Sequence, residues 1–477
     1  MGERVRPYLF YDVAVSICST CYRKVEGKIV FQAGSVYMLK RCPLHGDERV
    51  LLADDVEYYR RCREVFIKPP EMPLRFNTPV RWGCPYDCGL CADHQQHSCL
   101  SLIEVTDHCN LQCPICYAGS GPSRQQYRTL DHIQRMIDAV VRNEGEPDVV
   151  QISGGEPTIH PEFFAILDRA KAAPIRHLMV NTNGIRIAAD EAFAKRLAEY
   201  MPDFEVYLQF DSFERGPLME LRGADLRDVH RRAVDRLNEL GVSTTLVVTL
   251  KKGLNDGEIG RIIDFALEQP CVRGVALQAI QAAGRLEAFN PATDRLTLSE
   301  VRRRILEQTS VFRPEDVLPV PCHPDSLAMA YALKCDGKVI PLTGLIDPKT
   351  LIEAGRNTIV YEQDDAVRDG VFRLFATNHS PESGADSLRD LLCCLPRLDA
   401  PSQLGYQNIF RVIIMQFIDA FSFDVRSVKK TCVHIVHPDG RLIPFDTYNL
   451  FYRDDLERMR LAPLRAGIEL AVEGRTS

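Results

Sequence analysis

Two stretches of the sequence carry three cysteines each at the same spacing, C-x3-C-x2-C. The first is CPYDCGLC at 84–91, and the second is CNLQCPIC at 109–116. Cysteines in such short groups are typical ligands of metal ions and iron–sulfur clusters. Because the surroundings of the two stretches differ, we expect them to do different chemistry.

The second stretch follows SLIEVT at 101–106, a short apolar run typical of a buried strand. Three thiolates bind three irons of a 4Fe–4S cluster and leave the fourth open to a substrate or cofactor. We therefore predict that a catalytic cluster is held by Cys109, Cys113 and Cys116. A three-cysteine zinc site or a structural loop is the alternative.

A pair of glycines follows the next predicted strand, in QISGGEP at 151–157. Because they lack side chains, Gly154 and Gly155 would let a backbone edge approach a ligand closely. The exposed N–H and C=O groups of such an edge can bind the amino group of a cofactor. No comparable glycine pair belongs to the first cysteine stretch.

The first stretch is followed by a fourth cysteine, in CADHQQHSC at 91–99. Four thiolates close all four irons of a cluster, which can then carry an electron but cannot bind a cofactor. We predict an auxiliary 4Fe–4S cluster on Cys84, Cys88, Cys91 and Cys99. A zinc knuckle is the alternative, since four thiolates also suit tetrahedral zinc.

A third group lies near the N-terminus, where C-x2-C and CPLHG flank a predicted hairpin. This pattern is typical of a zinc ribbon or a rubredoxin-like iron site. The predicted ligands of one Zn or Fe ion are Cys18, Cys21, Cys42 and His45, with Cys62 replacing His45 if the site is all-thiolate iron.

The remaining cysteines are scattered. A second auxiliary cluster in the C-terminal part would draw on Cys322, Cys335, Cys393, Cys394 and Cys432. Free cysteines are also among the most buried residue types, so these residues could instead belong to the core. We assign Cys271, which has no neighbour of this kind, to the core.

Short apolar strands alternate with helical patterns between 101 and 286. The strands are predicted at 101–106, 148–153, 177–181, 204–210, 243–250 and 274–280, and the helices at 129–143, 161–172, 189–199, 226–240 and 257–268, with start signals at Thr129 and Asn255. Six such units predict an α/β fold, a partial (βα)6 barrel. The predicted domains are a metal-binding ribbon at 1–70, an auxiliary cluster segment at 71–100, the barrel at 101–286 and a mixed α+β domain at 287–477.

Composition narrows the class of protein. The 477 residues are 45% hydrophobic and carry a net charge of −7, so we expect no nucleic-acid partner. The N-terminus lacks the apolar core of a signal peptide and no apolar run reaches 18 residues, so we expect a cytoplasmic protein without a transmembrane segment.

Two segments of the C-terminal part have a recognisable pattern. The most apolar stretch, 410–423, is predicted to be a buried helix or the wall of an apolar channel, and 431–445 is predicted to be a hairpin.

The cysteine loop after one strand and GGEP after the next resemble the radical S-adenosylmethionine superfamily. The resemblance implies reductive cleavage of S-adenosylmethionine to a 5′-deoxyadenosyl radical, with the methionine part held by Gly154, Gly155 and Glu156. Further motifs follow later strands, VNTNG at 180–184 and QFDS at 209–212. Side chains at these strand ends could orient the cofactor or substrate, and they are Tyr117, Asn181, Asn183, Gln209 and Asp211.

The unbroken stretch 83–118 is similar to the archaeal tetraether synthase family and its relatives, the class D radical methyltransferases. PCHPDS at 321–326 and HPDGRLIPFDTYN at 437–449 extend the likeness. The resemblance implies a radical cluster, auxiliary clusters and a mononuclear rubredoxin-like iron. Ser326 and Asp446 stand where relatives often have further cysteines, which puts the ligands of the C-terminal cluster in question.

Three functions fit this sequence. The first is a radical enzyme that forms a C–C bond on an aliphatic, lipid-like substrate, with possible peripheral membrane contact. The second is radical methylation or alkylation of a small heterocycle such as a pterin. Both need an external electron donor of the ferredoxin or flavodoxin type. The third, a non-catalytic electron carrier, has no need of the GGEP loop.

Overall fold

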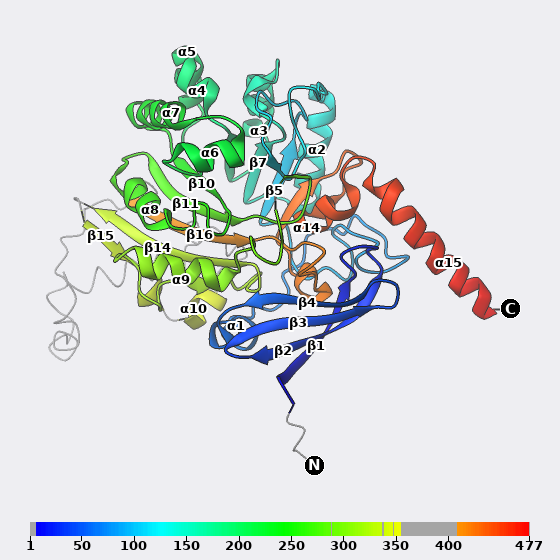
Figure 1. The fold of residues 1–477 in the computed structure, drawn as a ribbon. Helices are drawn as coiled ribbons and strands as arrows, with labels where there is room; N and C mark the ends of the chain where they lie inside the picture. Colours follow the sequence, from blue (N-terminus) through cyan, green and yellow to red (C-terminus); the bar gives the residue numbers. More distant parts are fainter. Residues whose placement is uncertain (1–5, 288, 336–337, 347, 354–407, 477) are drawn as a thin grey trace, which may run out of the picture.

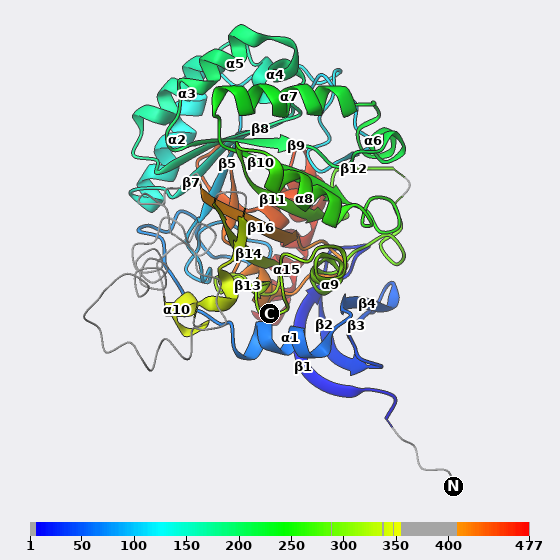
Figure 2. The same ribbon diagram turned by 90° about the vertical axis from the view of Figure 1, so that its left-hand side faces the viewer.

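A curved sheet of parallel strands forms the centre of the molecule (Figures 1 and 2). The computed structural model describes residues 6–287, 289–335, 338–346, 348–353 and 408–476. Six strands lie side by side in chain order, which confirms the predicted partial barrel: β5 (Leu100–Glu104), β7 (Val149–Ser153), β8 (His177–Thr182), β9 (Phe204–Gln209), β10 (Thr244–Leu250) and β11 (Val272–Ala279).

Helices cover the outer face of this sheet (Figure 2). They are α2 (Leu130–Glu144), α3 (Phe163–Ala172), α4 (Ile185–Ala189), α5 (Glu191–Ala198), α6 (Arg215–Arg222), α7 (Arg227–Leu240) and α8 (Ile259–Glu268). Thr129 caps α2 as predicted, its side chain accepting a hydrogen bond from the amide of His132. Asn255 does not cap α8, because its side chain instead joins the backbone of Lys251 to that of Thr249.

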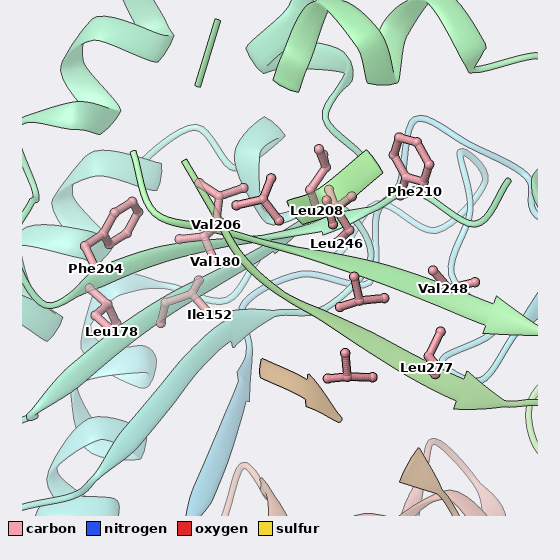
Figure 3. Close-up of a cluster of buried hydrophobic side chains, with 14 of the residues drawn as sticks. Ile152, Leu178, Val180, Phe204, Val206, Leu208, Phe210, Leu246, Val248 and Leu277 are labelled. Atoms are coloured by element: carbon pink, nitrogen blue, oxygen red, sulfur yellow. The ribbon is translucent and has the colours of Figure 1, made fainter. Parts of the chain in front are cut away.

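Alternation along the strands separates a core from a cavity. Side chains that point toward the helices are apolar and buried, and Figure 3 shows Ile152, Leu178, Val180, Val206, Leu208, Leu246, Val248 and Leu277 among them. The residues between them point inward, because successive side chains of a strand face opposite sides. Several of these inward residues are polar, including Gln151, Asn181 and Gln209.

The apolar stretch at 410–423 contains a strand that ends at Gln416 and is followed by a loop, so the expectation of a buried helix is wrong. β16 (Ile409–Gln416) runs parallel to β11 and continues the barrel sheet. Its run of branched side chains suits a strand buried on both faces: Val412 and Ile414 face the helix layer, and Ile413 and Met415 face inward. The inward Arg411 breaks the apolar pattern because it pairs with the buried Glu205.

C-terminal strands complete both edges of the sheet. β14 (Leu327–Cys335) pairs antiparallel with β16 and also with β13 (Leu318–Pro319) and β15 (Lys338–Pro341). At the other edge, β17 (Val433–Val436) runs parallel to β5 and forms the predicted hairpin with β18 (Leu442–Pro444). The C-terminal part of the chain therefore supplies strands on both sides of the barrel.

The N-terminal part is a meander of four antiparallel strands below the barrel in Figure 1. These are β1 (Leu9–Ile17), β2 (Lys24–Gln32), β3 (Ser35–Cys42) and β4 (Gly46–Ala53), followed by α1 (Val56–Glu64). A two-residue strand in the second cysteine stretch, β6 (Ile115–Cys116), pairs with β12 (Arg285–Leu286).

Shorter elements and one long helix make up the rest of the described chain. Two 3-10 turns lie at Pro157–Ile159 and Thr343–Leu345, and two π-helical turns at Tyr448–Tyr452 and Glu457–Leu461. The remaining helices are α9 (Leu298–Gln308), α10 (Pro348–Glu353), α13 (Val425–Val428), α14 (Phe445–Thr447) and α15 (Ala462–Thr476). Among the described helices, none has the length and apolar character needed to cross a bilayer.

Candidate active site

A cavity that is partly open to solvent lies at the carboxyl ends of the barrel strands. In parallel barrels this end is where active sites form. Most of the predicted site residues line it: Cys109, Cys113, Cys116, Tyr117, Gly154, Gly155, Glu156, Asn181, Asn183 and Gln209. Asp211 is fully buried behind the wall instead.

The three cysteines of the second stretch lie together on one loop at the rim of this cavity. Burial raises the pKa of Cys109 to about 12 and also raises that of Cys113, so these thiols would ionise on binding a cationic group. Two cysteine groups in the described chain have all ligand atoms within 4.8 Å of one another, and these three residues form neither. Their wider spread fits a four-iron cluster better than a single ion.

The glycine pair holds two loops in register. Gly154 has φ of 128°, and a Cβ there would lie 2.3 Å from the Thr106 carbonyl oxygen. A Cβ on Gly155 would lie 2.1 Å from the carbonyl oxygen of His108. The Gly155 and Glu156 amides donate to the same two oxygens, at 2.8 and 2.9 Å. Only glycine permits this approach, which fixes the loop after β7 to the segment leading into Cys109.

The carboxylate of Glu156 is used inside the protein. It is 1% exposed and accepts hydrogen bonds from the Thr158 hydroxyl at 2.5 Å, the Thr182 hydroxyl at 2.7 Å and the Asn183 amide at 2.8 Å. Burial raises the pKa of Glu156, against the effect of these bonds. Its geometry therefore suits a role in joining the loops after β7 and β8.

A chain of polar side chains crosses the cavity wall. Gln209 Nε2 donates to Asn181 Oδ1 at 2.7 Å, and Arg222 donates to Gln209 Oε1 at 2.7 Å. Asp211 holds the guanidinium of Arg222 in a forked ion pair, with contacts of 2.5 and 2.9 Å. Arg222 also lies close enough to Cys113 to oppose the rise of its pKa that burial causes. Sequence reasoning missed Arg222, which is the last residue of α6.

Deeper in the cavity, amide side chains project from β7 and β11 and from the loop after β11. Gln278 Nε2 donates to the Tyr207 hydroxyl at 2.9 Å. Gln151 Nε2 and Gln281 Oε1 are buried without a hydrogen-bond partner among the described residues. Buried polar atoms are rarely left unpaired. These two atoms are therefore positioned to pair with a ligand.

Aromatic and apolar side chains form the opposite wall. The Phe445 ring lies 4.1 Å from that of Phe417 and 5.0 Å from that of Tyr117, centroid to centroid. Tyr117 is backed by Arg453, which lies 5.4 Å from its ring centre and makes a forked ion pair with Glu104 at 2.8 and 3.0 Å. Such a wall can pack against the face of a planar ring.

The four side chains predicted to bind the N-terminal ion lie together in the structure. Ligand atoms of Cys18, Cys21, Cys42 and His45 all lie within 4.8 Å of one another. His45 Nδ1 is 3.5 Å from the sulfurs of both Cys18 and Cys42. Burial opposes ionisation of Cys42, yet hydrogen bonds from the Leu44 and His45 amides and the His45 ring lower its pKa to about 6. Cys62 packs in the main core and is not part of this group of four.

Cys99 departs from the predicted grouping. Its sulfur lies with those of Cys322 and Cys432, all within 4.8 Å and all fully buried. The sheet register explains this, because Leu100 of β5 faces Val433 of β17 and therefore brings the preceding cysteines together. The first stretch keeps three cysteines, of which Cys84 and Cys88 share a hydrogen bond that lowers the pKa of the former and raises that of the latter.

The other C-terminal cysteines do not join this group. Cys335 ends β14, and its backbone lies roughly 27 Å along the strand from Leu327, at about 3.4 Å per residue. Cys322 precedes the opposite end of that strand, so one cluster cannot bind both. Cys393 and Cys394 lie outside the described residues. Cys271 belongs to the main core, as expected.

Comparisons with known proteins match two regions of the chain and most of its length. The profile described as Radical SAM superfamily matches residues 103–266, and that described as HMPTM N-terminal zinc ribbon domain matches residues 10–54. The 7,8-dihydro-6-hydroxymethylpterin dimethyltransferase of Methanocaldococcus jannaschii is 30% identical over 94% of this chain and 96% of its own length.

Two further likenesses are confined to part of the chain. A GTP 3′,8-cyclase of Actinobacillus succinogenes is 28% identical over 39% of this chain and 55% of its own length. The crystal structure of Streptococcus suis SuiB bound to S-adenosylmethionine matches 44% of this chain and 47% of that one, at 17% identity and a TM-score of 0.38. The chain belongs to the radical S-adenosylmethionine superfamily, and within it to the family of the M. jannaschii dimethyltransferase, with a 4Fe–4S cluster and S-adenosylmethionine as cofactors.

Proposed function

We propose that this chain catalyses the radical methylation or alkylation of a small heterocycle such as a pterin. The observation that carries the proposal is the unpaired state of Gln151 Nε2 and Gln281 Oε1, a buried donor and a buried acceptor at one cavity. A pterin offers ring nitrogens, an amino group and a carbonyl that would satisfy both. The full-length relative named as a pterin dimethyltransferase supports the same substrate class.

The cofactor side of the cavity is formed by the cysteine loop and the glycine pair. A reduced 4Fe–4S cluster held by Cys109, Cys113 and Cys116 would supply the electron that cleaves S-adenosylmethionine into the radical that removes hydrogen from the substrate. The backbone at Gly154 and Gly155 would receive the methionine part. Arg222 would hold its charge beside Cys113, and Glu156 would fix the loops on which these groups lie.

The substrate side would recognise a planar ring by its edge and its face. Amide groups of Gln151, Gln278 and Gln281 would pair with the heteroatoms of the ring, and the rings of Phe417 and Phe445 would pack against its face. The role of the protein is then to hold one carbon of the ring near the radical and to exclude water. Methylation also requires a second S-adenosylmethionine or another one-carbon donor.

Three further metal sites would complete the enzyme. The ribbon ligands Cys18, Cys21, Cys42 and His45 would bind Zn or Fe. The auxiliary cysteines would form two groups, one of Cys84, Cys88 and Cys91 and one of Cys99, Cys322 and Cys432. Electrons would reach the enzyme from a ferredoxin or flavodoxin.

C–C bond formation on a lipid-like chain is the second candidate. Besides the aromatic wall, the lining of the cavity includes four apolar side chains, those of Leu100, Leu102, Met415 and Val433. Such a lining suits an aliphatic substrate, but an aliphatic chain would leave the two amide atoms unpaired, at a cost of about 1–3 kcal/mol each.

Deuterium transfer distinguishes the two candidates. Anaerobically reconstituted protein would receive reductant, S-adenosylmethionine and either a deuterated hydroxymethyl-dihydropterin or a deuterated lipid extract, and the 5′-deoxyadenosine would be analysed by mass spectrometry. We expect deuterium in 5′-deoxyadenosine with the pterin. Deuterium from the lipid alone would overturn the proposal in favour of the second candidate.

A further inference from the structure

A short strap, residues 282–286, lies directly on the loop that holds the predicted cluster ligands. Arg285 donates to the Cys113 carbonyl at 2.5 Å and to the Ser120 carbonyl at 2.7 Å, and it pairs in β-register with Cys116. Gly284 has φ of 65°, and a Cβ there would lie 2.4 Å from the Cys116 carbonyl oxygen. The strap therefore contacts the loop backbone on both sides of Cys116.

The strap is anchored by Asp419, which is 1% exposed. Asp419 accepts a hydrogen bond from the Ala282 amide at 2.9 Å and pairs with the guanidinium of Arg295. Its other carboxylate oxygen accepts from the Phe421 amide at 3.0 Å. Hydrogen bonds to a buried carboxylate are stronger than neutral ones, so this residue fixes where the strap begins.

The anchor is in turn tied to the N-terminal ribbon by Lys40, whose side chain is 1% exposed. Lys40 Nζ donates to the carbonyls of Ala420 at 2.8 Å, Phe421 at 3.0 Å and Ile17 at 2.8 Å. An ion pair with Glu48 at 2.9 Å completes its surroundings. Lys40 lies two residues before Cys42, and Ile17 directly precedes Cys18, so both ends of this contact adjoin ribbon ligands.

We propose that the ribbon positions the cysteine loop at 109–121 through Lys40, Asp419 and Arg285. The three side chains are linked through the backbone. Lys40 binds the carbonyls that follow Asp419, Asp419 binds the amide at the start of the strap, and Arg285 of the strap binds the carbonyls of Cys113 and Ser120. Metal binding in the ribbon would then order the cysteine loop through these contacts. This inference goes beyond the proposed function and does not depend on which substrate the enzyme takes.

Hydrogen exchange of the loop amides tests the proposal. Hydrogen-bonded amides of the loop include that of Cys109, which donates to the Gly121 carbonyl, and that of Gly119, which donates to the Cys116 carbonyl. In the reconstituted full-length protein we expect Lys40→Met and Asp419→Asn to speed exchange across 109–121 about tenfold, as expected for the loss of a hydrogen bond to a charged group. The dissociation constant of S-adenosylmethionine, measured by equilibrium dialysis, should rise by a similar factor.

Milder and matched variants separate positioning from stability. Arg285→Lys keeps the charge but loses the forked contact, so it should affect the loop with little change in the melting temperature. Lys28→Met, on the exposed face of the neighbouring strand β2, is the control and should leave the loop unchanged. The contrary result is that Lys40→Met, Asp419→Asn and Arg285→Lys lower the melting temperature but equal Lys28→Met in loop exchange and in affinity for S-adenosylmethionine. In that case the role of the three residues is structural and the proposal is wrong.

Removal of a ribbon ligand tests the metal itself. Cys21→Ser should reduce the metal content of the ribbon and speed exchange at 109–121, although Cys21 belongs to a different domain. Equal loop exchange in Cys21→Ser and the wild type, with ribbon metal lost, would overturn the part of the proposal that assigns the ribbon a role.

Discussion

The two ends of the central barrel are built from the same strands but treat their buried polar groups differently. At the amino end, the carboxylate of Glu205 accepts from Arg411 at 2.8 and 3.0 Å and from His177 at 3.2 Å. At the carboxyl end, Gln151 and Gln281 each keep a buried atom without a partner in the described chain. At the amino end, called the closed end below, these charged groups pair with one another within the protein. The other end is incomplete without a ligand.

This contrast separates stability from function within single strands. β9 carries Glu205 near its amino end and Gln209 at its carboxyl end, where Gln209 lines the cavity. The two residues are four positions apart, so their side chains lie on the same face of the strand. Inward positions at one end can therefore be selected for pairing, and those at the other end for reactivity. Substitutions at the amino end should therefore change the free energy of unfolding, and substitutions at the carboxyl end should change activity or ligand binding.

The largest effect is expected at the cysteine loop. Cys113→Ala removes one of three thiolates at the predicted cluster, so formation of 5′-deoxyadenosine should fall to background while the fold persists. The measurement is 5′-deoxyadenosine by mass spectrometry, with circular dichroism to monitor folding. Cys271→Ala, which alters a buried cysteine of the core, is the matched control and should retain activity. Activity in Cys113→Ala would remove the cluster from the proposed chemistry.

The next largest effect is expected at the closed end. Glu205→Gln leaves the buried guanidinium of Arg411 without its countercharge, which should cost about 3–5 kcal/mol of the free energy of unfolding. Denaturant titration measures this cost. Glu191→Gln breaks the exposed pair of Glu191 with Lys195 and should leave the free energy of unfolding unchanged within error. If the two variants have equal stability, the closed end is not the stabilising one.

The sequence predicted contacts between residues that are close together in the chain, but it did not predict contacts between residues that are far apart in the chain. The predicted ribbon ligands lie in short knuckles joined by a hairpin, so their spacing alone predicted that the four side chains would lie together. Cys99 and Cys432 meet because β5 and β17 are neighbours, and no local pattern reveals that register. The same limit misassigned 410–423, whose apolar run fits a helix or a strand until its partner β11 is known.

Within the candidate site, the sequence identified the residues of motifs but not those of the strand interior. Gln151 and Gln278 interrupt apolar strands, which marks them as unusual. Whether such a residue is paired inside the protein or open to a ligand depends on the side chains that other strands place around it. Arg222 was missed for the same reason, since its role follows from its contacts with Asp211 and Gln209.

A smaller effect is expected from pH, and its sign differs between the two ends. Burial would raise the pKa of Glu205, but the charge of Arg411 and the hydrogen bond from His177 hold it below its ordinary value of 4.5. The stability that Glu205 contributes is therefore present above about pH 4.5 and is lost as the pH falls, by about 1.4 kcal/mol for each unit by which its pKa is lowered.

Glu156 at the cavity should behave in the opposite way. Burial raises the pKa of Glu156, so the stability that it contributes is present below the ordinary value of 4.5 and is lost as the pH rises through its folded pKa.

The pH dependence of stability tests the prediction for Glu205. Denaturant midpoints measured between pH 3 and pH 7 should decrease less steeply toward acid pH in Glu205→Gln than in the wild type. Parallel curves for the two proteins would show that Glu205 is not held ionised by Arg411.

The smallest effect, and the sharpest test of the contrast, is expected at Gln151. Gln151→Leu removes a buried donor that has no partner in the described chain, so the free energy of unfolding should stay the same or rise by up to about 1 kcal/mol. The dissociation constant of the heterocycle should rise about five- to tenfold, the equivalent of one neutral hydrogen bond, while that of S-adenosylmethionine stays constant. Gln134→Leu, on helix α2 and away from the cavity, should change neither constant. A loss of stability in Gln151→Leu without a change in heterocycle binding would mean that Gln151 is satisfied within the protein, and the two ends of the barrel would then differ less than the structure indicates.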